Sequence, residues 1–294
     1  MLKFIPLAGI RQLANQTLWF GLSSIVGRFI NYLLNPILTT IYASEAFGEI
    51  SILYSGAAFL NIIYAIGMET AFFRFSKDHD NKKVFNNTFA ILILSSLLIS
   101  SILILFRKPI SGYMELGNHP EYIVLMILIV ALDTLAVIPF AKLRLEGRPR
   151  KFALIKLANI MINVGLVIFF LYFCKGNYES GKSGWLTAIY LPSIDIGYVF
   201  IAQLTASLIT LVLLMSEWKT FRFSVEISFL KELFIYSLPL IIVGFGGMVN
   251  EIIDRFLLLK RFPGTISEIK STVGIYSANY KLAALIVIFI QTFR

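Results

Sequence analysis

The sequence predicts an all-α polytopic membrane protein with about eight transmembrane helices. Its longest uncharged stretch, Val84 to Phe106, runs for 23 residues without an acidic or basic side chain, and Ile196 to Ser216 gives 21 more. A helix needs about 20 apolar residues to cross the hydrocarbon core of a bilayer, so both stretches are long enough. The composition agrees, because 57% of the residues are hydrophobic and only 15% are charged, against about 25% charged in soluble domains.

The predicted spans follow one another along the whole chain, separated by short polar connections. A basic turn at 144–151 contains Gly147 and Pro149, which break the helix between the fourth and fifth spans. A polar connection at 175–195 is too short to form a domain. The eight predicted spans are residues 14–41, 48–73, 85–106, 121–141, 153–174, 196–216, 233–259 and 272–293.

The distribution of basic residues predicts how the chain is oriented. With the N-terminus in the cytoplasm, the cytoplasmic side receives fifteen Lys and Arg side chains, with Lys156 near the start of the fifth span counted among them, and the outer side receives seven. An excess of basic residues on the cytoplasmic side is the rule in membrane proteins. The net charge of +9 is thus explained by orientation, and nucleic acid is not an expected partner.

The first and seventh spans begin a repeated pattern. Six identities align about 227 positions apart with a single one-residue gap. A repeat unit of six spans returns the chain to its starting side, so the copies would be parallel, as in transporters that bind substrate between two lobes. The matched positions are Arg28, Phe29, Pro36, Gly48, Ser51 and Tyr54 in one copy and Arg255, Phe256, Pro263, Gly274, Ser277 and Tyr280 in the other.

This repeat predicts the domain organisation. Residues 1–222 would form a first six-helix transmembrane lobe, and residues 223–294 would be the first two helices of an incomplete second lobe. The sequence is therefore expected to be cut short.

Ionisable residues at membrane depth predict the functional site, because placing each one in lipid costs about 3 kcal/mol. Cations suit an anionic ligand, since Arg binds phosphate in a bidentate way and Lys supplies a point charge. Arg28, Asn31 and Asn35 share one face of the first span, which indicates a water-filled lumen. The substrate-binding candidates are Arg28, Asn31, Asn35, Arg255 and Lys281, and the candidates for ion coupling are Glu69, Asp133, Glu251 and Asp254.

Structural roles are the alternative for most of these residues. Asp254 adjoins Arg255 and Glu251 lies one turn earlier, so Arg255 can be paired locally. Glu69 and Asp133 can act as capping or structural groups. For Arg28 no acid lies within a helical turn, which favours the lumen.

No enzymatic site, cofactor or metal site is predicted. Gly176 to Ser183 matches the phosphate-loop pattern, but that motif needs a buried strand before it, and here a membrane span precedes it. The single cysteine, Cys174, and the distant His79 and His119 do not suit a Cys or His metal cluster.

Several stretches together carry a resemblance to a known family: Leu13 to Pro36, Phe47-Gly48, Glu69 to Phe75, and Arg144 to Pro149. Over essentially the whole chain, the sequence resembles the bacterial polysaccharide biosynthesis flippases, the O-antigen and exopolysaccharide exporters of the multidrug/oligosaccharidyl-lipid/polysaccharide superfamily. Chains of that family are much longer, and this sequence lacks most of the second lobe.

The resemblance implies a fold of two six-helix lobes enclosing a cationic cavity in the bacterial inner membrane. It implies movement of undecaprenyl-pyrophosphate-linked oligosaccharide from the inner to the outer leaflet. Arg28, Arg255 and Lys281 would contact the pyrophosphate or acidic sugars. Na⁺ or H⁺ would be the coupling cation, and a polysaccharide polymerase and other assembly proteins would be partners alongside membrane lipids.

Other functions remain as alternatives. A multidrug exporter of the same superfamily would hold acids in its cavity, whereas this chain places Arg at matching positions of the first and seventh spans. A lipid II flippase also requires a cationic cavity. A membrane-embedded polyprenyl-phosphate enzyme would need a charged cluster in one loop, and a truncated remnant would not transport at all.

Overall fold

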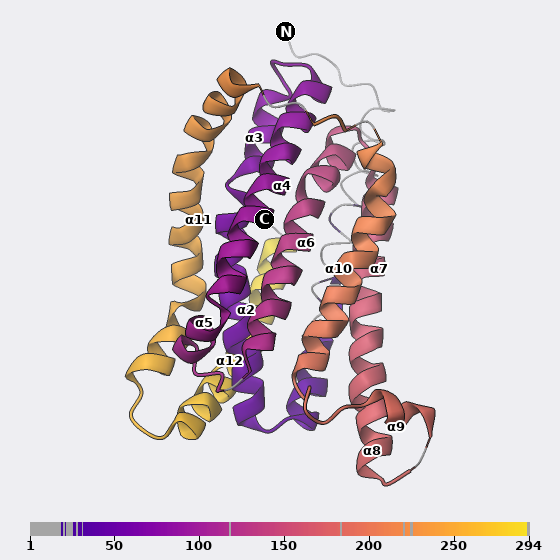
Figure 1. Cartoon of the computed structure of the whole chain (residues 1–294), viewed down its shortest axis with the longest axis vertical. Helices are drawn as coiled ribbons and strands as arrows, with labels where there is room; N and C mark the ends of the chain where they lie inside the picture. The colour runs from indigo at the N-terminus through magenta and orange to yellow at the C-terminus, as the bar shows by residue number, and fades with distance from the viewer. Residues whose placement is uncertain are drawn as a thin grey trace.

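The computed structural model describes residues 19, 21, 26–27, 29–30, 32–117, 119–182, 184–219, 221–223 and 226–292, with side chains described except at 250–251 and 284–292. All regular structure in these ranges is helical (Figure 1). A short apolar helix, Tyr32–Ile41, comes first. The helices that follow are α2 (Ser44–Ala65), α3 (Met68–Phe75), α4 (Asn81–Leu105), α5 (Arg107–Tyr113), α6 (Pro120–Leu145), α7 (Pro149–Ile168), a π-helix (Phe169–Lys175), α8 (Gly176–Glu179), α9 (Trp185–Ile189), α10 (Gly197–Trp218), α11 (Ile227–Arg261) and α12 (Ile266–Thr292).

Six helical stretches within the described ranges are long and apolar enough to cross a membrane. They coincide with the second to seventh predicted spans, and the eighth predicted span falls within α12. Twelve of the 28 residues of the first predicted span lie outside the described residues, and the described part includes the apolar helix Tyr32–Ile41. The prediction of an all-α polytopic membrane protein is confirmed. The six stretches are Ser44–Phe75, Asn81–Leu105, Pro120–Leu145, Pro149–Glu179, Gly197–Trp218 and Ile227–Val249.

The ends of several helices follow from local chemistry. The Asp80 carboxylate accepts a hydrogen bond from the backbone N–H of Lys83 at 3.2 Å and caps α4. Pro120 and Pro149 occupy the first turns of α6 and α7, where a missing N–H costs nothing. Gly147, with φ of 64°, lies in the basic turn between them, as the sequence predicts.

The second predicted span is interrupted, which the sequence does not predict. Ile66 (φ 48°) and Gly67 (φ 65°) adopt left-handed backbone conformations and separate α2 from α3. A Cβ on Gly67 would lie 3.2 Å from Cβ of Leu240 on α11, so this glycine also allows close packing. The predicted span over 48–73 is found as the helical stretch Ser44–Phe75. The sequence conceals the break within it, because apolar residues flank the break on both sides.

Helix α6 forms the centre of the bundle. It packs against α2, α4 and α10, and Figure 1 draws it between α4 and α10. Ile127, Val130 and Ile138 on α6 are almost completely buried. The first lobe is therefore organised around this helix.

The connection between α10 and α11 is attached to the first turns of α4. The side-chain oxygens of Asn86 and Asn87 accept hydrogen bonds from the backbone N–H groups of Arg222 (3.1 Å) and Glu226 (3.0 Å). Lys83 forms an ion pair with Glu226 at 2.7 Å. The domain boundary that the repeat predicts, at 222/223, falls within this connection.

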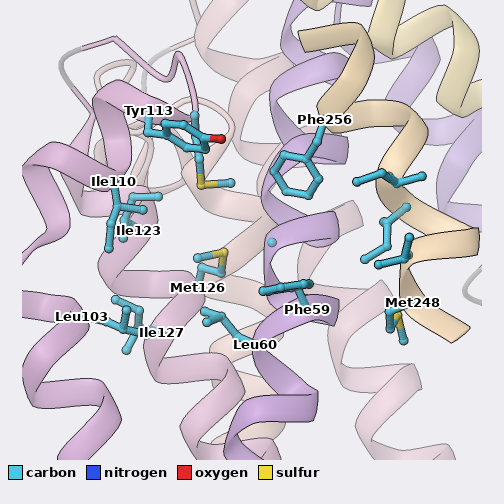
Figure 2. Close-up of a pocket in the computed structure, with 15 residues that line it drawn as sticks. Phe59, Leu60, Leu103, Ile110, Tyr113, Ile123, Met126, Ile127, Met248 and Phe256 are labelled. Carbon is cyan, nitrogen blue, oxygen red and sulfur yellow. The ribbon is translucent and has the colours of Figure 1, made fainter. Parts of the chain in front are cut away.

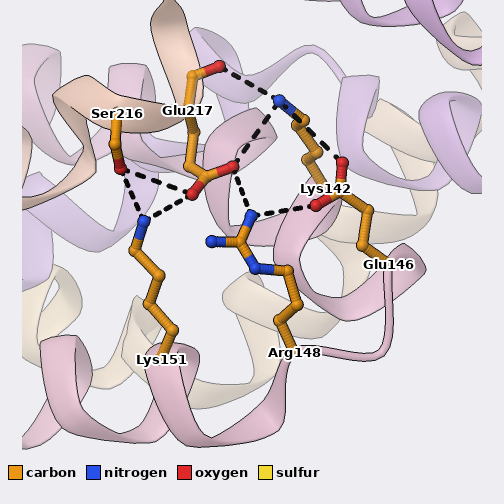
Figure 3. Close-up of polar contacts among 6 residues, drawn as sticks. All are labelled: Lys142, Glu146, Arg148, Lys151, Ser216 and Glu217. Carbon is orange, nitrogen blue, oxygen red and sulfur yellow. Dashed lines mark hydrogen bonds and ion pairs between the residues drawn. The ribbon is translucent and has the colours of Figure 1, made fainter.

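A cluster of charges joins α6, α7 and α10 at one end of the lobe (Figure 3). The Glu217 side chain is only 3% exposed and accepts hydrogen bonds from Arg148 (2.9 Å) and Lys151 (2.5 Å). Lys142 lies 3.5 Å from the same carboxylate, while Glu146 contacts Arg148 from the solvent side. One buried carboxylate thus holds the ends of three helices together.

The closest approach of two helices occurs between α2 and α12. A Cβ added to Gly48 would lie less than 3.0 Å from the carbonyl oxygen of Lys270, and a Cβ added to Gly274 would lie less than 3.0 Å from that of Ser44. Both obstacles are backbone atoms, so no side-chain rotation could relieve them. We call this contact the glycine crossing.

The glycine crossing is reciprocal. Gly48 and Gly274 lie 226 positions apart, as do Ser44 and Lys270, and 226 is the spacing of the repeat after its one-residue gap. Gly48 lies against Lys270, and its counterpart Gly274 lies against Ser44, which is the counterpart of Lys270. Equivalent residues of the two copies meet as at a two-fold axis, which supports the repeat inferred from sequence.

We expect Gly48→Ala and Gly274→Ala to destabilise the protein. In an ordinary helix this change is favourable by about 0.5–1 kcal/mol, but here the added methyl must separate two backbones, and overpacking costs about 1–3 kcal/mol. Thermal unfolding in detergent, followed by size-exclusion chromatography, would show a lower midpoint. Gly165→Ala in α7 is the matched control, because its added Cβ meets nothing within 4 Å. A Gly274→Ala midpoint no lower than that of Gly165→Ala would contradict the role of the crossing.

Removing the Glu217 charge should also lower stability. Glu217→Gln leaves Arg148, Lys151 and Lys142 without their shared carboxylate, and breaking a buried pair costs about 3 kcal/mol or more. Glu146→Gln is the control, because its carboxylate is 40% exposed, and such surface pairs contribute at most about 1 kcal/mol. Equal thermal midpoints for the two variants would show that the cluster does not hold the helices together.

Candidate functional site

A small cavity lies where α2, α11 and α12 meet, and we call it the cationic cavity. Its volume is about 150 Å³. Two of its lining side chains, Arg255 and Lys281, carry a positive charge and come from different helices of the second copy. The remaining lining residues are Ser51, Tyr54, Ser55 and Ala58 of α2 and Met248 and Ile252 of α11.

Arg255 is buried and held by residues of the repeat. Its exposed fraction is 7%, its Nε donates to Ser277 Oγ at 3.3 Å, and its guanidinium carbon lies 4.7 Å from the centre of the Tyr280 ring. The hydroxyl and the ring face fix the guanidinium in the position that borders the cavity. Ser277 and Tyr280 are the counterparts of Ser51 and Tyr54, which line the same cavity from α2.

Lys281 joins the two copies through an amide. Its Nζ donates to Asn35 Oδ1 at 2.7 Å and lies 5.1 Å from the centre of the Phe47 ring. These contacts bring together two of the predicted substrate-binding residues, Asn35 and Lys281, which are 246 positions apart. Arg255 and Lys281, also predicted, share the cavity.

Asp254 makes a contact that the sequence does not predict. Its Oδ2 accepts a hydrogen bond from the Tyr276 hydroxyl at 2.6 Å. The carboxylate is thus engaged with α12, although it adjoins Arg255 in sequence. Arg28 and Asn31, and the side chain of Glu251, lie outside the described residues.

A second, larger cavity lies within the first lobe, between α2–α3, α6, α7 and α10, and we call it the polar cavity. Its volume is about 480 Å³. Glu69 and Asp133, both predicted for ion coupling, line it together. Glu69 forms an ion pair with Arg144. Asp133 accepts a hydrogen bond from Ser207 Oγ at 2.6 Å, and no described residue forms an ion pair with it within 4.0 Å.

Other polar residues of this cavity were not among the predicted site residues. Lys156 borders it with Nζ 4.5 Å from the Phe140 ring centre, and Asn159 donates to Thr210 at 2.9 Å. Lys156 was counted with the cytoplasmic charges as a residue near the start of the fifth span, and in the structure it lies in the second turn of α7 and borders this cavity. The signal was available, because Lys156, Asn159 and Asn163 recur at three- and four-residue spacing on an otherwise apolar helix, as Arg28, Asn31 and Asn35 do.

The phosphate-loop match has a different local structure from the motif. Gly176–Glu179 forms the single-turn helix α8 directly after a π-helix at Phe169–Lys175. No strand precedes it in the described part of the chain, so the backbone arrangement that cradles phosphates is not formed by these residues.

Comparison with known proteins gives one match. A family described as polysaccharide biosynthesis protein matches residues 13–293, which is nearly the whole chain and includes both cavities. None of the curated proteins and none of the solved structures compared gives a significant match. With its membrane-spanning helices and a family match of this length, the chain belongs to the polysaccharide biosynthesis protein family.

Proposed function

We propose that the protein moves a lipid-linked anionic oligosaccharide of the undecaprenyl-pyrophosphate type across the bacterial inner membrane, for surface polysaccharide or O-antigen synthesis. The observation that carries this proposal is the cationic cavity. Arg255 and Lys281 border one space between helices of the two copies, and a pyrophosphate offers several oxygens to such donors. Membership of a polysaccharide biosynthesis family supports a glycan as the rest of the substrate.

Arg28 is included in the proposed site on the strength of the repeat. The repeat relates Arg28 to Arg255, and it relates Ser51 and Tyr54 to the two side chains that hold Arg255. Ser51 and Tyr54 line the cavity. A third cation from the first span would give the two lobes equivalent roles toward the anion.

Export of cationic drugs is the competing function, and the charge of the cavity disfavours it. Both charged side chains that border the cavity among the described residues are basic, and a cation would be repelled by them at close range. The carboxylates of Glu69 and Asp133 lie instead in the polar cavity of the first lobe.

Alternating access requires the contacts between α2 and α12 to separate during the cycle. Around the glycine crossing, Glu49 pairs with Lys270 at 2.6 Å, and Ser267 donates to Glu45 at 2.6 Å. These contacts close the end of the bundle that carries the α11–α12 connection, drawn at the bottom of Figure 1. The basic-residue count predicts that this end faces outside, and we propose that the structure represents a state closed to the outside.

We further propose that Asp133 is the ion-coupling residue. Glu69 is engaged with Arg144, whereas Asp133 has a neutral hydrogen-bond partner in Ser207 and borders an open polar space. Lys156 borders the same cavity and acts on Asp133 from beyond ion-pair distance. A carboxylate at membrane depth that forms no direct ion pair with a described residue is suited to take up H⁺ or Na⁺. Binding of the cation there would alter the packing of α6 against α10.

Loss of the cavity charges should abolish export. We expect Arg255→Gln combined with Lys281→Met to remove surface polysaccharide, because each lost charge-assisted hydrogen bond costs about 1.5–3 kcal/mol, or about 10- to 100-fold in affinity. The assay is complementation of a strain lacking the gene, with protein in the membrane fraction measured by immunoblot. Arg261→Gln, an exposed cation on the same helix, is the control. Normal polysaccharide in the double variant would refute the anionic-lipid site.

Neutralising Asp133 should remove the dependence on an ion gradient. In proteoliposomes, transport of a short-chain polyprenyl-pyrophosphate glycan by the unaltered protein should rise when a H⁺ or Na⁺ gradient is imposed. In Asp133→Asn the rate should be the same with and without the gradient. Asp254→Asn serves for comparison, because its carboxylate contacts Tyr276 outside the polar cavity. Gradient stimulation that survives in Asp133→Asn but not in Asp254→Asn would transfer the coupling role to Asp254.

A further inference from the structure

A large apolar groove lies between the first lobe and α11. Its volume is about 380 Å³, and it is lined from α2, α4, α5 and α6 on one side and from α11 on the other (Figure 2). Phe59, Val249 and Ile253 line it while remaining 39%, 45% and 37% exposed, so the groove is open along its length. Among the residues whose side chains the structure describes, neither an acidic nor a basic one borders it.

The groove and the cationic cavity share a wall. Met248 and Ile252, one turn apart on α11, line both spaces. On α2, Ser55 lines the cavity and the next residue, Gly56, lines the groove. The next turn of α11 repeats the division, because Arg255 borders the cavity and Phe256 borders the groove. The cationic cavity and the apolar groove thus adjoin each other and are separated by a single layer of side chains.

We propose that this groove holds the hydrocarbon chain of a lipid whose phosphate group occupies the cationic cavity. This inference rests on the proposed function and assigns the tail of the same substrate to a specific place. An amphipathic lipid needs an apolar space directly beside an anion site, and the shared wall supplies that arrangement. The partition is adaptable, because Met248 has a flexible thioether side chain that can move aside where head and tail join.

Gly56 keeps the groove deep on the α2 side. A Cβ at this position would lie 3.0 Å from Cε of Met114 and 3.3 Å from Sδ of Met126. The absence of a side chain, and the two methionines that face it, leave a surface that can adjust to a branched chain. The groove is therefore suited to the methyl-branched profile of a polyprenyl chain.

The energetic role of the groove differs from that of a pocket in a soluble protein. Lipid tails are as apolar as the lining side chains, so transfer of the chain from bilayer to groove yields little hydrophobic free energy. The groove instead retains the chain beside α11 while the cavity binds the head. Occupancy should consequently depend on the phosphate and on Arg255, which distinguishes a substrate site from a face covered by ordinary lipid.

Photolabelling tests the proposal directly. The full chain is placed in vesicles of phosphatidylethanolamine and phosphatidylglycerol with a polyprenyl phosphate that carries a diazirine on its hydrocarbon chain, and labelled residues are mapped by mass spectrometry. We expect labelling at Phe59, Val249 and Ile253 that unlabelled polyprenyl phosphate abolishes. Leu97 and Leu98 of α4, each 64% exposed and outside the groove, should show only labelling that is not competed.

Variants separate this proposal from the function on which it rests. Val249→Trp and Ile253→Trp fill the groove and should reduce competed labelling about tenfold, equivalent to about 1.4 kcal/mol; Leu257→Trp, exposed on α11 but outside the groove, should not. Arg255→Gln should reduce it similarly. Uncompeted labelling of the groove in a protein whose export still requires Arg255 would overturn the tail site and leave the proposed function intact. Competed labelling that persists in Arg255→Gln would overturn the link between groove and cavity.

Discussion

The approach of two backbones at the glycine crossing determines where the rest of the structure can lie. In a bilayer, helices gain no hydrophobic free energy by associating, so close packing and polar contacts must supply the attraction. Gly48 and Gly274 allow that packing, and the pair formed by Glu49 and Lys270 lies beside them. Ser51 and Tyr54 lie one and two turns after Gly48, and Ser277 and Tyr280 lie one and two turns after Gly274. The distance between the helices at the crossing therefore also sets the width of the cationic cavity.

Glu69 and Asp133 line a different space from Arg255 and Lys281, and α2 is the wall between the two cavities. Ala58 of α2 lines the cationic cavity, while Asn61, three residues later, lines the polar cavity with Asp133. A displacement of α2 would therefore change both spaces at once. Coupling between two sites requires an element whose position both ligands bias. Helix α2 lines both cavities, so under the proposed function it is the element that both ligands would bias, and its break at Ile66 and Gly67 supplies a point about which it can move.

Sequence reasoning recovered the elements whose signals are local and missed those that depend on tertiary contacts. Long apolar runs predict the spans, and the repeat singles out Gly48 and Gly274, but only the structure shows that these two glycines meet. Asn35 and Lys281 were named separately as polar residues at membrane depth, but their hydrogen bond depends on packing between residues 246 positions apart. The contact of Asp254 with Tyr276 was missed because adjacency in sequence favoured Arg255. Lys156 was missed as a site residue because it lies near the start of the fifth span and was therefore counted with the cytoplasmic charges.

The size of the cationic cavity has a consequence for the transport cycle. At about 150 Å³ it is smaller than ordinary ligand pockets, which enclose about 300–1,000 Å³, so it can receive phosphate groups but not an attached oligosaccharide. If the protein moves a lipid-linked oligosaccharide as proposed, the loaded state must therefore be wider between α2, α11 and α12. Moving the tail costs little, because the groove and the bilayer are equally apolar, whereas the polar head must be solvated throughout its passage. Two requirements follow: room for the oligosaccharide and water around the polar head. Both are met if the space around Arg255 and Lys281 widens while the glycine crossing still closes the end of the bundle that carries the α11–α12 connection.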